Sequence, residues 1–220
     1  MLKSDVFQRT ETSSKTVPNP LYNFIIGLVL CWGFLINWLM VKNINPAIIL
    51  EIPIFVFLIC YFASCFFGVY LFNNYDQPII SFIGYNCVVV PFGLIVNLVV
   101  SQYDPGIVLE AIKITGIVTG VMMIMGTMFP AFFQRIAGAL GIAIFAVLII
   151  ELFQIFILKT HQNWLDWAIA LIFCGYIGYD WSRANQIPKT VDNAIDSAAA
   201  IYMDVINLFL RILRILGRRR

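Results

Sequence analysis

Charged side chains are scarce in this chain. Asp, Glu, Lys and Arg together make up 12% of its 220 residues, 61% of the residues are hydrophobic, and the mean hydropathy is +0.89. A water-soluble domain carries about 25% charged residues. The shortage of charge therefore excludes a single soluble globule and indicates a protein of the lipid bilayer.

The residue patterns of common metal, redox and nucleotide sites are also missing. The one histidine, His161, has no second His or Cys nearby, and the five cysteines show no C-x-x-C spacing, so neither a zinc site nor a disulfide framework is indicated. Gly138 and Gly141 do not lie between a strand and a helix, as a nucleotide-binding loop requires. With a net charge of only +2, the chain is not expected to bind nucleic acid. We expect no cofactor and no enzymatic activity.

Long apolar runs dominate the chain instead. Each is close to the roughly 20 residues that a helix needs to cross a bilayer core of about 30 Å. Lipid admits only helices or closed barrels, because every backbone polar group must find an internal partner. We predict an all-α polytopic membrane protein with seven transmembrane helices. The seven runs cover residues 21–41, 47–72, 79–100, 107–129, 136–158, 164–181 and, with more polar residues, 191–216.

The connections between these runs are short and contain Asn, Pro, Asp and Gly. Such loops make consecutive helices antiparallel neighbours and leave no room for a domain outside the membrane. We therefore predict a single seven-helix domain over residues 20–217. Residues 1–19 are expected to form a mobile polar tail and residues 218–220 a basic tail.

The positions of Lys and Arg in the loops predict the orientation, because these residues favour the cytoplasmic side. A cytoplasmic N-terminus places Arg135, Arg183 and Lys189 inside and leaves only Lys42 and Lys159 outside. The arginines at the end of the chain oppose this arrangement if the last run crosses fully. That run either crosses against the charge bias, enters and returns, or lies at the interface.

The last run carries a polar stripe. At 100° per residue, its polar side chains fall within a sector about 120° wide. A helix lying on the membrane surface would carry Lys and Arg along its whole polar face, whereas the first part of this stripe is acidic or amide. We therefore favour a helix at the centre of the bundle, surrounded by the other six. The stripe consists of Asp192, Asn193, Asp196, Asp204, Asn207, Arg211 and Arg214.

Two aspartates, Asp180 and Asp204, interrupt the last two runs. A charge at bilayer depth costs roughly 2.5 to 3.5 kcal/mol, so such a residue is a candidate functional site. The two lie on successive antiparallel helices joined near Pro188. Counting the helical rise per residue from that turn places Asp204 about 9 Å deeper in the membrane than Asp180. The same count places Asp196 closer to the depth of Asp180.

Two carboxylates that meet in a medium of low polarity cannot both ionise, and they titrate as a unit that shares a proton. Such a pair offers the oxygen ligands that Ca²⁺ prefers and can exchange the ion for protons. A meeting of Asp180 and Asp204 would therefore have the properties of a pH-sensitive gate.

The end of the chain closely resembles the Bax inhibitor-1 family, also called the transmembrane Bax-inhibitor-motif family. That family has an aspartate after an aromatic residue late in its sixth helix, which Tyr179-Asp180 matches. Its seventh helix carries a Y-x-D-(I/V)-(I/V)-N-L-F pattern, which residues 202–209 match as YMDVINLF. The specific motif covers about the last fifth of the chain, and the resemblance indicates a bacterial member.

The resemblance implies a seven-helix fold in which six helices surround the seventh, and a pH-sensitive Ca²⁺ leak gated by Asp180 and Asp204. In that reading the two aspartates also bind the permeating Ca²⁺ transiently. It implies a multi-pass protein of the bacterial cytoplasmic membrane whose partners are Ca²⁺, protons and lipid, with other membrane proteins as further candidate partners. On this precedent we pair Asp180 with Asp204 despite the difference in counted depth.

The sequence departs from the family at one position. Some bacterial relatives pair the sixth-helix aspartate with an arginine of the second helix. Residues 47–72 contain no Lys, Arg or His, and their only charged residue is Glu51. Gating is therefore expected to differ from that in those relatives.

Three further polar residues are candidates for a role near the pair. Asp196 and Asn207 belong to the same polar stripe as Asp204 and are expected to hydrate or orient the two carboxylates. Glu151 lies inside the fifth run and is a candidate second station on a cation path. The alternative for Glu151 is a protonated side chain hydrogen-bonded to a neighbouring helix.

Two other functions compete with the leak. A non-conducting regulator would bind other membrane proteins, such as death-pathway proteins or a quality-control protease, with the terminal arginines as a docking or anionic-lipid patch. An intramembrane aspartyl protease is the more remote alternative. Tyr179-Asp180 fits its first motif, but the Gly-x-Gly-Asp and Pro-Ala-Leu elements are absent.

Overall fold

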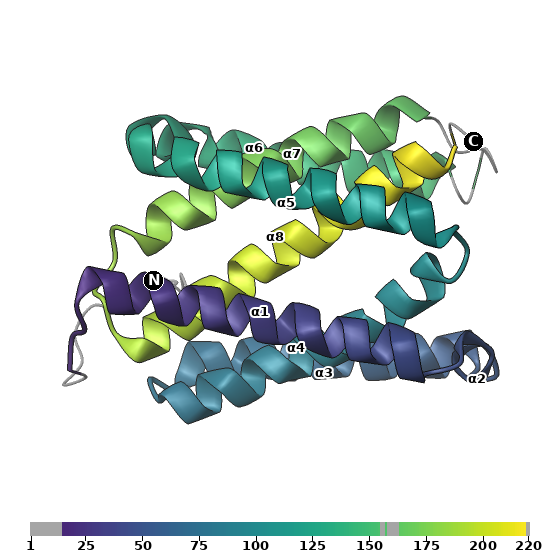
Figure 1. The fold of residues 1–220 in the computed structure, drawn as a ribbon, viewed down its shortest axis with the longest axis horizontal. Coiled ribbons are helices and arrows are strands. Elements are labelled where there is room, and N and C mark those ends of the chain that lie inside the picture. Colours follow the sequence, from purple (N-terminus) through teal and green to yellow (C-terminus); the bar gives the residue numbers. More distant parts are fainter. Residues whose placement is uncertain (1–14, 155–156, 158–162, 219–220) are drawn as a thin grey trace. The chain divides into compact units, whose positions relative to one another are not determined.

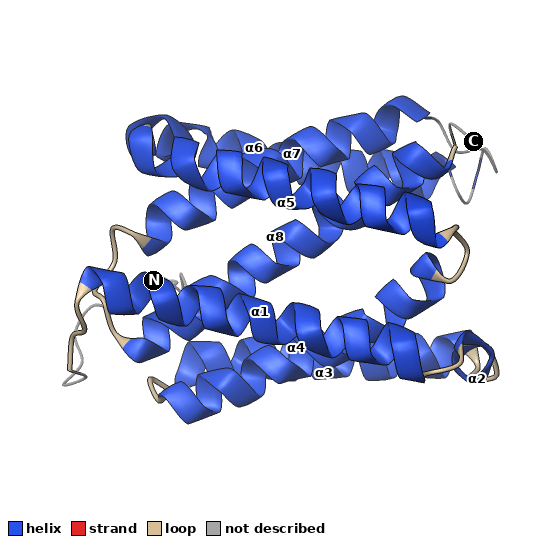
Figure 2. Cartoon of the chain, viewed as in Figure 1, coloured by secondary structure: helices blue, strands red, loops and turns tan. Residues whose placement is uncertain are grey.

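The computed structural model describes residues 15–154, 157 and 163–218, and within these residues the only regular secondary structure is helical (Figure 2). The all-α prediction is therefore confirmed for the described part of the chain. Most of the polar tail, the loop with Lys159 and His161, and Arg219 and Arg220 lie outside it. The helices are α1 (Asn19–Asn43), α2 (Pro46–Leu50), α3 (Ile54–Asn74), α4 (Pro78–Val100), α5 (Pro105–Met128), α6 (Pro130–Phe153), α7 (Asn163–Ala184) and α8 (Val191–Gly217).

Prolines mark where several of these helices begin. Pro46, Pro78, Pro105 and Pro130 each occupy the first residue of a helix, where the missing N–H has no partner to lose and the fixed φ already suits the helix. Pro53 has the opposite effect. It disfavours helical backbone at the residue before it, so the apolar run over residues 47–72 is divided into the short α2 and the long α3.

Among the residues that the structure describes, five helices are long and apolar enough to cross a membrane: α1, α3, α4, α5 and α6. Their outer surfaces carry large exposed apolar side chains, of which Phe55 is 77% exposed and Ile142 is 74% exposed. Several such helices make the chain a multi-pass membrane protein. Helices α7 and α8 are not among the five, and both contain buried carboxylates.

The chain forms two compact units, drawn in Figure 1. The first comprises residues 1–102 and 186–202, which contain α1 to α4 and the first part of α8. Within this unit α4 packs against α1, α2 and α3. Its core contains the fully buried Tyr22, Tyr85 and Tyr202. The rings of Tyr85 and Tyr202 meet edge to face, with their centroids 5.6 Å apart.

Polar contacts join the first part of α8 to the other helices of this unit. Asn37 of α1 donates a hydrogen bond to the hydroxyl of Tyr202, with an N to O distance of 2.6 Å. Ser81 of α4 donates to Asp192 at 2.5 Å, and the hydroxyl of Tyr22 lies 3.1 Å from that of Ser197. Asp192, Ser197 and Tyr202 of α8 thus have hydrogen-bond partners on other helices, as buried polar groups generally do.

The second unit comprises residues 103–185 and 203–220, which contain α5, α6, α7 and the second part of α8. Helix α7 packs against both α5 and α6. Val147 of α6 and Leu165 and Ile169 of α7 form a buried apolar cluster. Helix α8 is one uninterrupted helix that supplies residues to both units.

Candidate functional site

Small residues allow a close approach of helices just before Asp180. A methyl group on Gly178 of α7 would collide with the ring of Phe133 of α6, and one on Gly126 of α5 would lie 2.5 Å from the carbonyl oxygen of Gly178. Next to this contact, the indole of Trp181 donates a hydrogen bond to Thr127 of α5 at 2.8 Å. The backbone that carries Asp180 is therefore held from two sides by packing that depends on glycine.

The carboxyl groups of Asp180 and Asp204 lie close enough to interact directly with each other. Both are buried, with exposed fractions of 9% and 7%. Because a carboxylate has no proton to donate, a hydrogen bond between two carboxyl groups requires that one of them is protonated. Oδ2 of Asp204 is buried without a hydrogen-bond partner among the described protein groups, so this oxygen remains available to a proton, a water molecule or a cation.

The register of α7 and α8 explains why counting from the turn misplaces this pair. Asp166 precedes Asp180 by 14 residues on α7, and Arg218 follows Asp204 by 14 residues. Asp180 contacts Asp204 and Asp166 contacts Arg218, so the two segments run antiparallel in one register. A symmetric turn would instead bring Ile195 opposite Asp180. The first part of α8 belongs to the other unit, so a count from the turn does not set this register.

Few other ionisable groups lie close to the pair. Tyr176 is near enough to interact electrostatically with both carboxylates, and Tyr179 interacts in the same way with Asp180. Arg183, one turn further along α7, donates a hydrogen bond to the hydroxyl of Tyr179, and its guanidinium carbon lies 5.7 Å from the centre of that ring.

The two carboxyl groups would supply only part of the ligand set of a metal ion. No group of three or more His, Cys, Asp or Glu side chains that could hold a metal occurs among the described residues. Ca²⁺ takes six to eight oxygen ligands, and the two carboxyl groups supply at most four. An ion at the pair would therefore keep several water ligands, which favours weak and transient binding.

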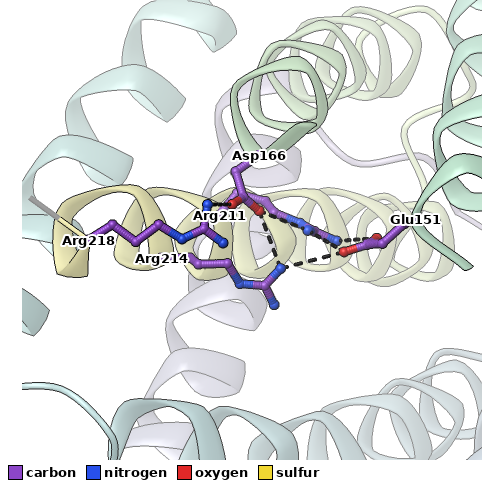
Figure 3. A network of polar contacts seen from close by, with 5 residues as sticks. All are labelled: Glu151, Asp166, Arg211, Arg214 and Arg218. Atoms are coloured by element: carbon purple, nitrogen blue, oxygen red, sulfur yellow. Dashed lines mark hydrogen bonds and ion pairs between the residues drawn. The ribbon is translucent and has the colours of Figure 1, made fainter. Parts of the chain in front are cut away.

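A second polar cluster lies further along α8 and is shown in Figure 3. Arg211 donates two hydrogen bonds to Glu151 of α6, at 2.7 and 2.9 Å, and a third to Asp166 of α7 at 3.0 Å. Arg218 lies 2.7 Å from the other oxygen of Asp166, and Arg214 lies 3.3 Å from Asp166 and 3.5 Å from Glu151. We call these five residues the arginine clamp.

The arginine clamp joins the ends of three helices. Glu151 lies near the end of α6, Asp166 near the start of α7, and the arginines at the end of α8. Asp166 is fully buried, and Arg211 is 15% exposed. A two-pronged arginine–carboxylate contact of this kind is both strong and directional. The cluster therefore binds α8 to α6 and α7.

The sequence predicted only part of this cluster. Glu151 was expected either on a cation path or as a protonated side chain, and the structure gives it two arginine partners. Asp166 was not singled out. The signal was nevertheless present, because charges in apolar runs must pair. Successive membrane-spanning helices alternate in direction. Three helix ends therefore lie on the same side of the membrane: the end of the fifth run, the start of the sixth and the end of the seventh.

The other two candidates, Asn207 and Asp196, have contacts within their own helix and unit. The side-chain amide of Asn207 donates to the carbonyl of Met203 on its own helix, at 2.7 Å. Asp196 is 2% exposed and lies in the part of α8 that belongs to the first unit, where it interacts electrostatically with Tyr22. Their roles beside the carboxylate pair stay predictions.

Comparison with known proteins decides the family. Residues 15–220 match the family described as Inhibitor of apoptosis-promoting Bax1. The chain belongs to the Bax inhibitor-1 family. The resemblance inferred from Tyr179-Asp180 and from residues 202–209 is thereby confirmed.

Relatives of this Bax inhibitor-1 family chain occur in a bacterium, a yeast and a plant. An uncharacterised protein of Helicobacter pylori is 29% identical over 124 residues, which are 56% of this chain and 53% of that protein. Bax inhibitor 1 of Schizosaccharomyces pombe is 32% identical over 57% of this chain and 47% of its own length. Protein LIFEGUARD 3 of Arabidopsis thaliana is 40% identical over 36% and 31%. The match to the first relatives spans about half of their length.

Proposed function

We propose that the protein is a pH-sensitive calcium leak in which Asp180 and Asp204 form the gate. The observation that supports this proposal is the contact between two buried carboxyl groups, one of which is left with a free oxygen. The pair binds a proton when its members touch and gains negative charge when the proton leaves. It can therefore alternate between a proton-bound form and a form that attracts Ca²⁺.

Part of the proposal is a full set of seven crossings, with α7 and α8 added to the five apolar helices. In this arrangement α8 is the central helix, because buried polar groups must be shielded from lipid by other helices. The N-terminus is cytoplasmic, and the membrane is the bacterial cytoplasmic membrane. The protein is a passive conductor rather than an enzyme, and it holds no cofactor.

Calcium flux into liposomes across a pH series tests this function. We expect the native protein to pass Ca²⁺ with a pH dependence that Asp180→Asn and Asp204→Asn each remove, because an amide cannot titrate. Asp104→Asn serves as a matched control, since Asp104 is an exposed loop residue. Flux that keeps its native pH profile in both pair variants contradicts the assignment of the gate, and absence of flux from the native protein contradicts the leak itself.

A non-conducting regulator is the second candidate, and the names of the family and of the yeast relative favour it. The family is described as an inhibitor of Bax1, and the yeast relative is named Bax inhibitor 1. A regulator would bind other membrane proteins and conduct no ions. Native protein that shows no flux in liposomes but captures a defined membrane protein, unchanged by Asp204→Asn, would favour this function over the leak.

A further inference from the structure

One guanidinium of the arginine clamp is only partly engaged. A single terminal nitrogen of Arg214 reaches the carboxylates, at 3.3 and 3.5 Å, whereas Arg211 makes contacts of 2.7 to 3.0 Å. Figure 3 shows the second terminal nitrogen of Arg214 directed away from Asp166 and Glu151. The side chain of Arg214 is 31% exposed. It therefore has donors to spare and access to an external ligand.

The charge of this cluster favours an anion. Three guanidinium groups and two carboxylates make up the clamp, so its five residues together carry one net positive charge. Residues 211–220 of the sequence contain five arginines and no acidic residue. Guanidinium groups recognise phosphate oxygens through paired hydrogen bonds, which an ammonium group cannot match.

Its location favours a lipid as the source of the anion. Trp164 and Trp167, in the first turns of α7 beside Asp166, are 52% and 50% exposed. Exposed tryptophan on a membrane protein typically lies at the level of the lipid head groups. Gly217 packs against Tyr103 just before α5, so the end of α8 lies beside the start of α5 in the same unit. The clamp is thus at the boundary of the bilayer core.

We propose that the exposed side of Arg214 binds the phosphate of an anionic phospholipid head group. The clamp carboxylates hold Arg211 and Arg218 in place, and Arg214 divides its donors between them and the lipid. A juxtamembrane arginine attracts anionic lipid through charge, and the fork of the guanidinium adds a directional contact with phosphate. This site is separate from the proposed gate and does not depend on ion conduction.

Thermal unfolding of the detergent-solubilised protein during lipid titration tests the proposal. Phosphatidylglycerol is expected to raise the midpoint temperature, and phosphatidylcholine is expected to raise it less, because a bound ligand stabilises the folded state. In Arg214→Gln, the phosphatidylglycerol concentration for half of the effect should rise about fivefold. Arg214→Lys, which retains the charge but not the fork, should fall between the native protein and Arg214→Gln.

Arg135→Gln is the matched control, because Arg135 is an exposed arginine at the opposite end of α6. An equal loss in Arg135→Gln and Arg214→Gln overturns the specific site, since it would reflect general surface charge. Equal stabilisation by the two lipids overturns the preference for anionic lipid. Inorganic phosphate at the same concentration should have no effect, and full stabilisation by it overturns the lipid as ligand. All variants retain the main clamp contacts of Arg211, so folding is preserved.

Discussion

Gly178 lies two residues before Asp180 and lets α5, α6 and α7 approach each other there. Because glycine has no side chain, the ring of Phe133 occupies the space where a methyl group would stand. The tight contact surrounds the backbone of Tyr179 and Asp180. The geometry of the carboxylate pair therefore depends on a residue with no chemistry of its own.

Gly178→Ala is expected to destabilise the protein by about 1 to 3 kcal/mol, because overpacking forces neighbouring helices apart. Gly120→Ala on α5 is the control, since a methyl group there would meet no atom within 4 Å and alanine favours a helix by up to about 1 kcal/mol over glycine. Thermal unfolding in detergent measures both. Equal stability of the two variants would show that the contact at Gly178 can relax.

Protonation of the carboxylate pair predicts a pH-dependent stability with a definite sign. The paired conformation holds a proton, whereas separated, solvated aspartates have a pKa of about 3.9 and are ionised at neutral pH. Its stabilisation is therefore complete at low pH and is lost as the pH rises through the titration of the pair. Asp204→Asn replaces the shared proton by a permanent amide donor, so its stability should vary less with pH than that of the native protein. Unfolding temperatures across a pH series measure this difference.

At the level of the helices, the apolar runs predicted most boundaries to within a few residues because lipid demands long apolar helices. There were two exceptions: Pro53 divides one run into α2 and α3, and α6 begins at Pro130, six residues before the predicted start at residue 136. The register between α7 and α8 was not available from the sequence. Counting assumed a symmetric turn, whereas the first part of α8 packs among α1 and α4, through Tyr22 and Ser81, before its second part reaches α7.

The arginine clamp predicts a strong coupling between α6 and α8. Arg211→Gln removes the two-pronged partner of Glu151 and one of the three arginine contacts of the buried Asp166. Breaking a buried ion pair from one side costs about 3 to 5 kcal/mol. Arg214 and Arg218 remain near Asp166, so the lower end of this range is expected. The double variant Glu151→Gln with Arg211→Gln should recover part of the loss. Additive losses in thermal unfolding would contradict direct coupling.

At the scale of the whole chain, the membrane topology is open to direct measurement. The proposed seven crossings from a cytoplasmic N-terminus place the loop between α3 and α4 inside and the loop between α4 and α5 outside. In a cysteine-free background, Asp104→Cys should react with an impermeant maleimide added outside intact cells, and Asp76→Cys should not. A cysteine appended after Arg220 should react like Asp104→Cys. Labelling like Asp76→Cys would show that α8 does not cross.

The division of α8 between two units has a consequence for the order of folding. Tyr22 and Ser197 are 175 residues apart, and Asn37 and Tyr202 are 165 apart. The ribosome therefore makes all of α1 to α7 before it supplies the helix that fills both cores. Until then, the buried polar groups of α1 and α4 lack their partners, and the charged end of α7 lacks its arginines. Until α8 is made, the nascent chain is incompletely packed in the membrane and exposed to quality-control proteases.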